Sequence, residues 1–180
     1  AARRAITFLE QQSEADGANI GVTGHSMGGR LTVLTATDSR VKAASPSVGG
    51  SGYLYEDIAG VPGSGRQMQA DKELYAATLD CSQYWPLIQC PVMFLGATND
   101  FNSPMEFVLR GFRTLPHGNG ALSFAPHRNH RFTGDNYAAR IRWFQTHLKH
   151  RFIFPQTART ELDLNSADGI SQFVVRPDVA

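Results

Sequence analysis

The segment GHSMG at residues 24–28 constrains the fold of this chain more than any other feature of its sequence. A short apolar run over residues 19–23 precedes it, and residues 30–37 have the composition and length of a helix. The pattern GxSxG between a strand and a helix is typical of a serine held on a tight turn with its hydroxyl exposed. We expect glycine at positions 24 and 28 because a side chain at either would collide with the neighbouring strand or helix.

Predicted helices and strands alternate over the first 150 residues. The helix at 30–37 is expected to turn Leu31 and Leu34 inward. The other expected helices cover residues 1–12, 70–79 and 104–115 and a last segment marked by Tyr137, Ile141, Phe144 and Leu148, and the other expected strands cover residues 41–47, 92–97 and 121–125. This alternation predicts an α/β fold with a parallel sheet and crossover helices.

Side chains indicate how two of these helices begin. Ser103 and Glu106 have the spacing of a capping box, in which each side chain bonds a backbone amide of the first helical turn. Asp135 is expected to cap the last helix.

Between the second and third strands, residues 49–69 are rich in Gly, Ser and Pro, which predicts a long excursion that shapes a binding site.

The chain changes character after residue 154. Residues 160–164 and 170–175 alternate apolar and polar side chains around a turn, which predicts a β-hairpin outside the α/β unit. We therefore divide the chain into an α/β domain over residues 1–150 and a hairpin segment over residues 151–180, which could begin a further β-domain. The N-terminal residues have the pattern of a helix already under way, so we expect a fragment and assign no cellular compartment.

Composition excludes several classes of function. The 17 Lys and Arg residues nearly balance the 16 Asp and Glu residues and form no long basic run, which argues against nucleic acid as a partner. The apolar runs are too short to span a membrane. Cys81 and Cys90 have no metal-ligand spacing; we read them as two separate thiols, with a disulfide between them left open. Without a ligand cluster or phosphate-binding loop, we expect no metal and no organic cofactor.

Ser26 is a weak nucleophile unless a histidine and a carboxylate activate it, and around this motif the chain order is serine, acid, histidine. Asp100 follows the strand at 92–97 and therefore lies at a carboxyl strand end, as Ser26 does. Asp80 and Asp57 are less favoured because their surroundings are less regular. The helix after Ser26 offers unpaired amides at its start, so the Met27 N–H is the expected first donor to an oxyanion.

The histidine is expected on the loop after the last strand, where two candidates lie close together. We favour His130 and keep His127 as the alternative. His25 is adjacent to the serine and is held by the same turn. The remaining histidines lie in or beside helix ends, where an ordinary surface role explains them: His117, His147 and His150.

Three segments carry a family resemblance: GHSMGG, PVMFLGATNDFNSP and APHRNHRFTGDNYAARIRWFQTHLK. They resemble the dienelactone-hydrolase-like and acetylxylan-esterase-like branch of the α/β-hydrolase superfamily, over residues 4–149. The resemblance implies the C-terminal portion of an α/β-hydrolase domain that lacks its N-terminal strands. It also implies that Asp100 and His130 complete the catalytic triad.

The resemblance implies a serine hydrolase that cleaves carboxylic esters, such as acetyl esters of carbohydrates, through an acyl-enzyme on Ser26. Dienelactone hydrolases use cysteine at this position, so ester hydrolysis is favoured over lactone opening. The loop that normally supplies the second oxyanion donor is not in this chain. Two alternatives stay open: a serine peptidase of the prolyl-oligopeptidase kind, which shares the triad order, and an inactive binding module on the same fold.

Overall fold

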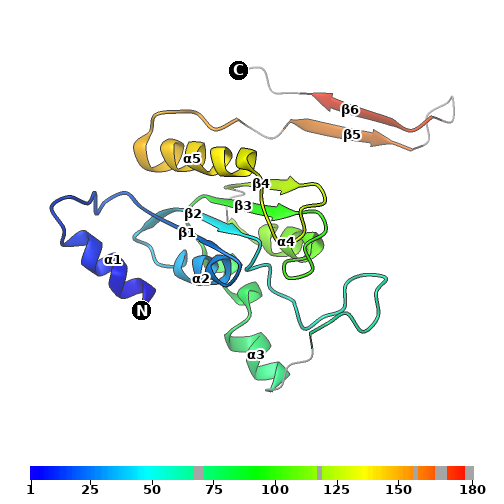
Figure 1. The fold of residues 1–180 in the computed structure, drawn as a ribbon, viewed down its shortest axis with the longest axis horizontal. Coiled ribbons are helices and arrows are strands. Elements are labelled where there is room, and N and C mark those ends of the chain that lie inside the picture. The colour runs from blue at the N-terminus through cyan, green and yellow to red at the C-terminus, as the bar shows by residue number, and fades with distance from the viewer. Residues whose placement is uncertain (67–70, 117–118, 156–157, 165–169, 177–180) are drawn as a thin grey trace.

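Four parallel strands form the central sheet of the computed structural model, which describes residues 1–66, 71–116, 119–155, 158–164 and 170–176. They are β1 (Ile20–His25), β2 (Val41–Ser47), β3 (Val92–Ala97) and β4 (Gly120–Ala125), side by side in chain order (Figure 1). The predicted parallel sheet is confirmed, and two of its strands have the predicted bounds. Because the strands are parallel, their carboxyl ends share one edge of the sheet.

Helices cover both faces of this sheet (Figure 1). They are α1 (Ala2–Glu10), α2 (Met27–Thr35), α3 (Lys72–Thr78), α4 (Met105–Phe112) and α5 (Gly134–Lys149), with the short 3-10 turns η1 (Cys81–Gln83) and η2 (Trp85–Leu87). Parallel strands in chain order joined by right-handed crossovers place every connecting helix on one face. Accordingly α2 and α4 lie on one side of the sheet and α5, which follows the last strand, lies on the other.

Each face of the sheet has its own core. On the α2 side, the fully buried Trp85 packs with Val33, Phe94 and Val108. On the α5 side, a smaller cluster joins Trp143 to residues of β2 and β3. Every residue of β3 is buried, as expected of a strand covered on both faces.

Several details of the helices differ from the sequence predictions. Leu31 is 51% exposed, because α2 turns Thr32 and Val33 toward the core instead. On α5, Tyr137 and Ile141 are exposed, and Trp143 is the large buried side chain. The other predicted residues, Leu34, Phe144 and Leu148, are partly buried and pack against the two cores, so each predicted apolar face is correct in part.

The predicted helix caps are also wrong. Pro104 precedes the first residue of α4, and no side chain caps this helix. Glu106 instead accepts a hydrogen bond from the backbone N–H of Ala59 in the excursion. At α5 the cap is Thr133 and not Asp135; the Thr133 hydroxyl and the Asn136 side chain form a reciprocal capping box.

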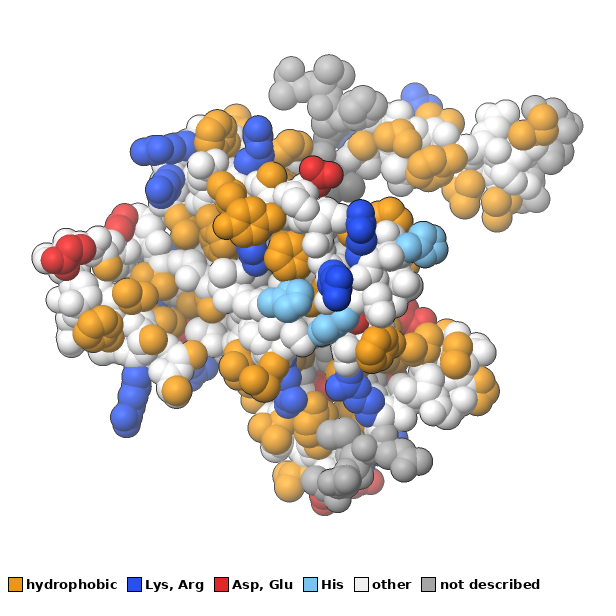
Figure 2. Space-filling model, in the orientation of Figure 1, with side chains coloured by type: hydrophobic (Ala, Val, Ile, Leu, Met, Phe, Trp, Pro, Cys, Tyr) orange, Lys and Arg blue, Asp and Glu red, His pale blue; other side chains and the backbone are white. Residues whose placement is uncertain are grey.

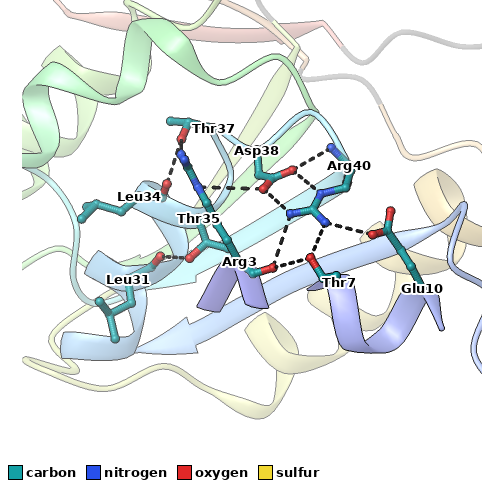
Figure 3. A network of polar contacts seen from close by, with 9 residues as sticks. All are labelled: Arg3, Thr7, Glu10, Leu31, Leu34, Thr35, Thr37, Asp38 and Arg40. Carbon is teal, nitrogen blue, oxygen red and sulfur yellow. Dashed lines mark hydrogen bonds and ion pairs between the residues drawn. The ribbon is translucent and has the colours of Figure 1, made fainter. Parts of the chain in front are cut away.

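Arg40 ties α1 to the turn between α2 and β2 (Figure 3). Its guanidinium donates to both carboxylate oxygens of Asp38 at 2.8 Å and to Glu10 Oε2 and Thr7 Oγ1 at 2.9 Å. The hydrogen bond from Arg40 holds the pKa of Asp38 at about 2, below its usual value of 3.8. Since Ile6 is the only buried residue of α1, these polar contacts are a large part of what holds the helix in place.

The predicted C-terminal hairpin is present as β5 (Arg159–Asp163) and β6 (Gln172–Arg176), an antiparallel pair separate from the main sheet. Every residue of both strands is exposed.

Cys81 and Cys90 are two free, buried thiols, so the disulfide that the sequence left open is not formed. Among the described residues, none of the helices is both long enough and apolar enough for a membrane span.

Candidate active site

Ser26 lies between the end of β1 and the start of α2, as predicted. Its backbone has φ 57° and ψ −115°, an unusual conformation for a residue other than glycine. The Ser26 N–H donates a hydrogen bond of 2.9 Å to the carbonyl of Ser47, at the end of β2. The neighbouring strand therefore holds the turn in this conformation and directs Ser26 to the carboxyl edge of the sheet.

The two glycines that flank Ser26 have different reasons for being glycine. A Cβ at Gly24 would lie 2.3 Å from the carbonyl oxygen of Gly28, so no side chain fits there. A Cβ at Gly28 would have no neighbour within 4 Å, so the collision predicted for that position is wrong. The crowded helix position is Gly29, where a Cβ would lie 2.7 Å from the carbonyl oxygens of Ser47 and Gly49.

Ser26, His130 and Asp100 are brought together from three separate strand ends. Nε2 of His130 lies 2.6 Å from Oγ of Ser26, and Nδ1 of His130 lies 3.1 Å from both carboxylate oxygens of Asp100. With its proton on Nδ1, His130 donates to the carboxylate and presents a free lone pair to the serine hydroxyl. This is the hydrogen-bond order required of a nucleophile, a base and an orienting acid.

Asp100 is buried and held in place by backbone amides. Its side chain has 0% exposure, and its Oδ1 also accepts from the backbone N–H groups of Asn102 and Ser103 at 2.8 and 3.3 Å. These amides fix the carboxylate on the loop after β3 while leaving both oxygens within reach of His130. Hydrogen bonds to the charged form stabilise a buried carboxylate.

The alternative candidates for the acid and for the histidine form hydrogen bonds with other groups. Asp80 is buried and accepts from the backbone amides of Tyr53 and Ser82. Asp57 accepts from the amides of Gly63 and Gly65, within the excursion. His127 is exposed, and its backbone N–H donates to Oγ1 of Thr98, so it helps to hold the loop that carries His130.

A second histidine lies beside this hydrogen-bond chain. The rings of His25 and His130 are 5.7 Å apart, and Phe132 packs edge-on against His25. Burial lowers the pKa of His25, and the nearby His130 and Arg140 lower it further. His25 is therefore protonated less readily than a free histidine, although part of its surface is exposed.

A cavity of about 340 Å³ opens beside Ser26 and His130. Val48, Leu54 and Tyr75 contribute apolar surface to it. The exposed Met27 lies at its rim, at the start of α2, where the first amides of the helix have no intrahelical partner. An organic group bound here would lie against the serine hydroxyl on one side and a helix N-terminus on the other.

Sequence reasoning missed four polar or aromatic residues of this cavity: Arg30, Arg66, Tyr75 and Asn102. Arg30 could have been found, because it lies one helical turn after Ser26 and so shares its end of α2. Arg66 lies in the excursion, Tyr75 on α3 and Asn102 on the loop after β3, and no sequence periodicity relates them to Ser26. His117 lies outside the described residues.

Comparison with solved structures shows the fold. An acetyl xylan esterase from Paenibacillus sp. R4 matches with a TM-score of 0.64 at 19% identity, over 81% of this chain and 50% of its own. A puromycin-hydrolyzing peptidase from Mycobacterium tuberculosis matches with a TM-score of 0.64 at 21% identity, over 82% of this chain and 24% of its own. An acylaminoacyl peptidase from Pyrococcus horikoshii matches with a TM-score of 0.60 at 22% identity, over 79% of this chain and 26% of its own.

These matches confirm the expected fold, part of an α/β-hydrolase with esterases and peptidases among its structural neighbours. The chain spans from about a quarter to half of the length of these proteins. The comparison with curated proteins gave no match. The family model described as the prolyl oligopeptidase family matches residues 3–151, which is most of the chain and includes Ser26, Asp100 and His130. The chain therefore belongs to the prolyl oligopeptidase family.

Proposed function

We propose that this protein hydrolyses carboxylic esters through a covalent acyl-enzyme on Ser26. The observation that carries the proposal is the unbroken hydrogen-bond chain from Ser26 Oγ to His130 Nε2, at 2.6 Å, and from His130 Nδ1 to Asp100, at 3.1 Å. A serine hydroxyl needs a base within hydrogen-bond distance, and the base needs an orienting partner. The distances around His130 support both conditions.

In the proposed reaction, Ser26 Oγ attacks the ester carbonyl carbon while its proton moves to Nε2 of His130. Asp100 stabilises the resulting imidazolium and keeps the ring in position. The carbonyl oxygen becomes an oxyanion beside the start of α2, where the Met27 N–H is our proposed first donor. His130 then protonates the departing alcohol, and water attacks the acyl-enzyme by the reverse sequence to release the acid.

An ester is our first choice of substrate because of the cavity and the structural neighbours. A volume of about 340 Å³ suits a small acyl or sugar group. The neighbours include an acetyl xylan esterase, which supports an acetylated carbohydrate as one substrate of this class. We place the catalytic part within residues 1–150, in line with the extent of the family match.

A peptidase is the second candidate, and the family match favours it. The two peptidases compared above share the fold of this chain, and the same serine, histidine and aspartate could cleave an amide. An amide is the harder substrate, because its amine leaving group must be protonated before it departs. The distinction therefore depends on the substrate contacts and not on the triad.

Paired substrates test the two candidates. We expect the protein to hydrolyse 4-nitrophenyl acetate and to leave peptide 4-nitroanilides intact, with the ester activity lost in Ser26→Ala. Faster hydrolysis of an anilide than of the ester would replace the esterase by the peptidase. Ester hydrolysis that persists in Ser26→Ala would contradict the proposed nucleophile.

A further inference from the structure

Two arginines from separate parts of the chain line the cavity beside Ser26. Arg30 lies on α2, and its backbone N–H donates to the Ser26 carbonyl at 3.2 Å. Arg66 lies at the end of the described excursion, where its N–H donates to the Leu54 carbonyl at 2.7 Å. Both are attached through the backbone to other residues of the cavity wall, so their positions relative to Ser26 are well defined.

The side chains of both arginines have uncharged partners. Nη2 of Arg30 donates to the carbonyl of Leu79 at 3.0 Å, and its guanidinium lies 5.3 Å from the centre of the Tyr75 ring. Nη2 of Arg66 donates to the side-chain oxygen of Asn102. These contacts orient each guanidinium, and neither hydrogen-bond partner carries a charge.

Within the described part of the chain, neither Arg30 nor Arg66 forms an ion pair with a carboxylate. The ion pairs of that part involve other arginines, namely Arg3, Arg40, Arg110 and Arg176, while Asp100 contacts His130. Asp100 and Asp80, the buried acids of this region, accept from His130 and from backbone amides. Figure 2 shows Lys and Arg side chains close to the histidines exposed on the face viewed.

Two oriented guanidinium groups in a half-enclosed site favour an anion with several acceptor oxygens. A carboxylate matches the planar fork of arginine and accepts two hydrogen bonds from it. The apolar wall and the volume of the cavity favour an organic ligand over a simple ion.

We infer that the cavity binds an ester that carries a carboxylate, with Arg30 and Arg66 holding that group while Ser26 attacks the ester carbonyl. The inference rests on the proposed ester hydrolysis and adds the charge of the substrate to it. Substrates of this class include acylated hydroxy acids and acylated acidic sugars. Neutral esters of the same shape would bind less tightly.

The test compares 4-acetoxybenzoate with 4-acetoxybenzamide, which carries a neutral amide in place of the carboxylate. Water cleaves either ester to acetate and the free phenol, which is followed by its absorbance. We expect kcat/KM to favour the carboxylate by about tenfold, mainly through KM, as for a charge-assisted hydrogen bond. The preference should weaken as salt is raised.

Single substitutions locate the effect. In Arg30→Gln and in Arg66→Gln the preference should fall several-fold, and in Arg113→Gln, an exposed arginine outside the cavity, it should stay as in the wild type. Arg66 is exposed, so its replacement leaves the core intact. A preference that is absent in the wild type, or that survives both cavity variants, overturns the inference.

A binding measurement separates this inference from the proposed function. Ser26 is labelled with a fluorophosphonate in the presence of 4-hydroxybenzoate or 4-hydroxybenzamide, the products of the two esters. Slower labelling with the carboxylate alone, lost in the Arg30 and Arg66 variants, supports the inference even where turnover is low. Equal effects of the two products contradict it and leave the esterase proposal standing, whereas a Ser26 that does not label contradicts the proposed function itself.

Discussion

The side chain of Asn99 accepts a hydrogen bond of 2.7 Å from the backbone N–H of Asn129, the residue directly before His130. Asn99 in turn directly precedes Asp100, so this bond joins the loop of the acid to the loop of the histidine. Asn129 has φ 54°, a left-handed conformation that asparagine tolerates better than most residues. The distance between Asp100 and His130 is thus controlled by their neighbours as well as by their own contact.

Replacing Asn99 should loosen His130 without removing any reacting group. We expect Asn99→Ala to lower kcat for 4-nitrophenyl acetate by about 10- to 100-fold with little change in KM, because small displacements of a base are costly. Asn19→Ala is the control, since the Asn19 amide donates to Asp16 within a surface turn. A kcat that stays at the wild-type level would show that Asp100 positions His130 unaided.

Gly24 and Gly28 form a matched pair for testing the turn around Ser26. Gly24→Ala should destabilise the protein by about 3 kcal/mol or more, because the new Cβ meets backbone that cannot move aside. Gly28→Ala should be neutral or stabilising by up to about 1 kcal/mol, since alanine is the better helix former and has space there. Urea unfolding of both variants measures the difference; equal losses would contradict the turn geometry.

Low pH should weaken the contact between Asp38 and Arg40, which helps to hold α1 in place. The pKa of Asp38 is about 2 in the folded protein and 3.8 without its partners, so the unfolded chain binds the proton more readily. The stabilisation is therefore complete above about pH 4 and is lost as the pH falls toward 2. Urea unfolding from pH 2 to 6 measures this. At pH 6 the wild type should have a larger free energy of unfolding than Asp38→Asn, and the difference should shrink toward zero as the pH approaches 2. A wild-type advantage that stays constant over this pH range would contradict the role of Asp38.

The sequence predicted the sheet well because buried parallel strands are continuous apolar runs with clear ends. Residues 41–47 and 92–97 became β2 and β3 without any change of bounds. The proximity of the candidate residues was expected for the same reason: the carboxyl ends of parallel strands meet, which brings Ser26 and Asp100 close to the loop that carries both His127 and His130.

Features that depend on packing between distant segments could not be predicted. Glu106 has the spacing of a local cap, yet it bonds Ala59 across the excursion. The rotation of α5 depends on where Trp143 fits between the helix and the sheet, which periodicity alone did not show. Arg66 reaches the cavity only because the excursion folds back toward α2, and its sequence neighbours give no sign of that.

The most direct test of the account is labelling of Ser26 by a fluorophosphonate, with the modified residue identified by peptide mapping. His130→Ala removes the proposed base, and His127→Ala is its matched control on the same loop. The account predicts labelling at Ser26 in the wild type and in His127→Ala, none at that position in Ser26→Ala, and a rate lowered by about 10²- to 10⁴-fold in His130→Ala. A wild-type protein that does not label, or labelling that depends on His127 instead of His130, would contradict it.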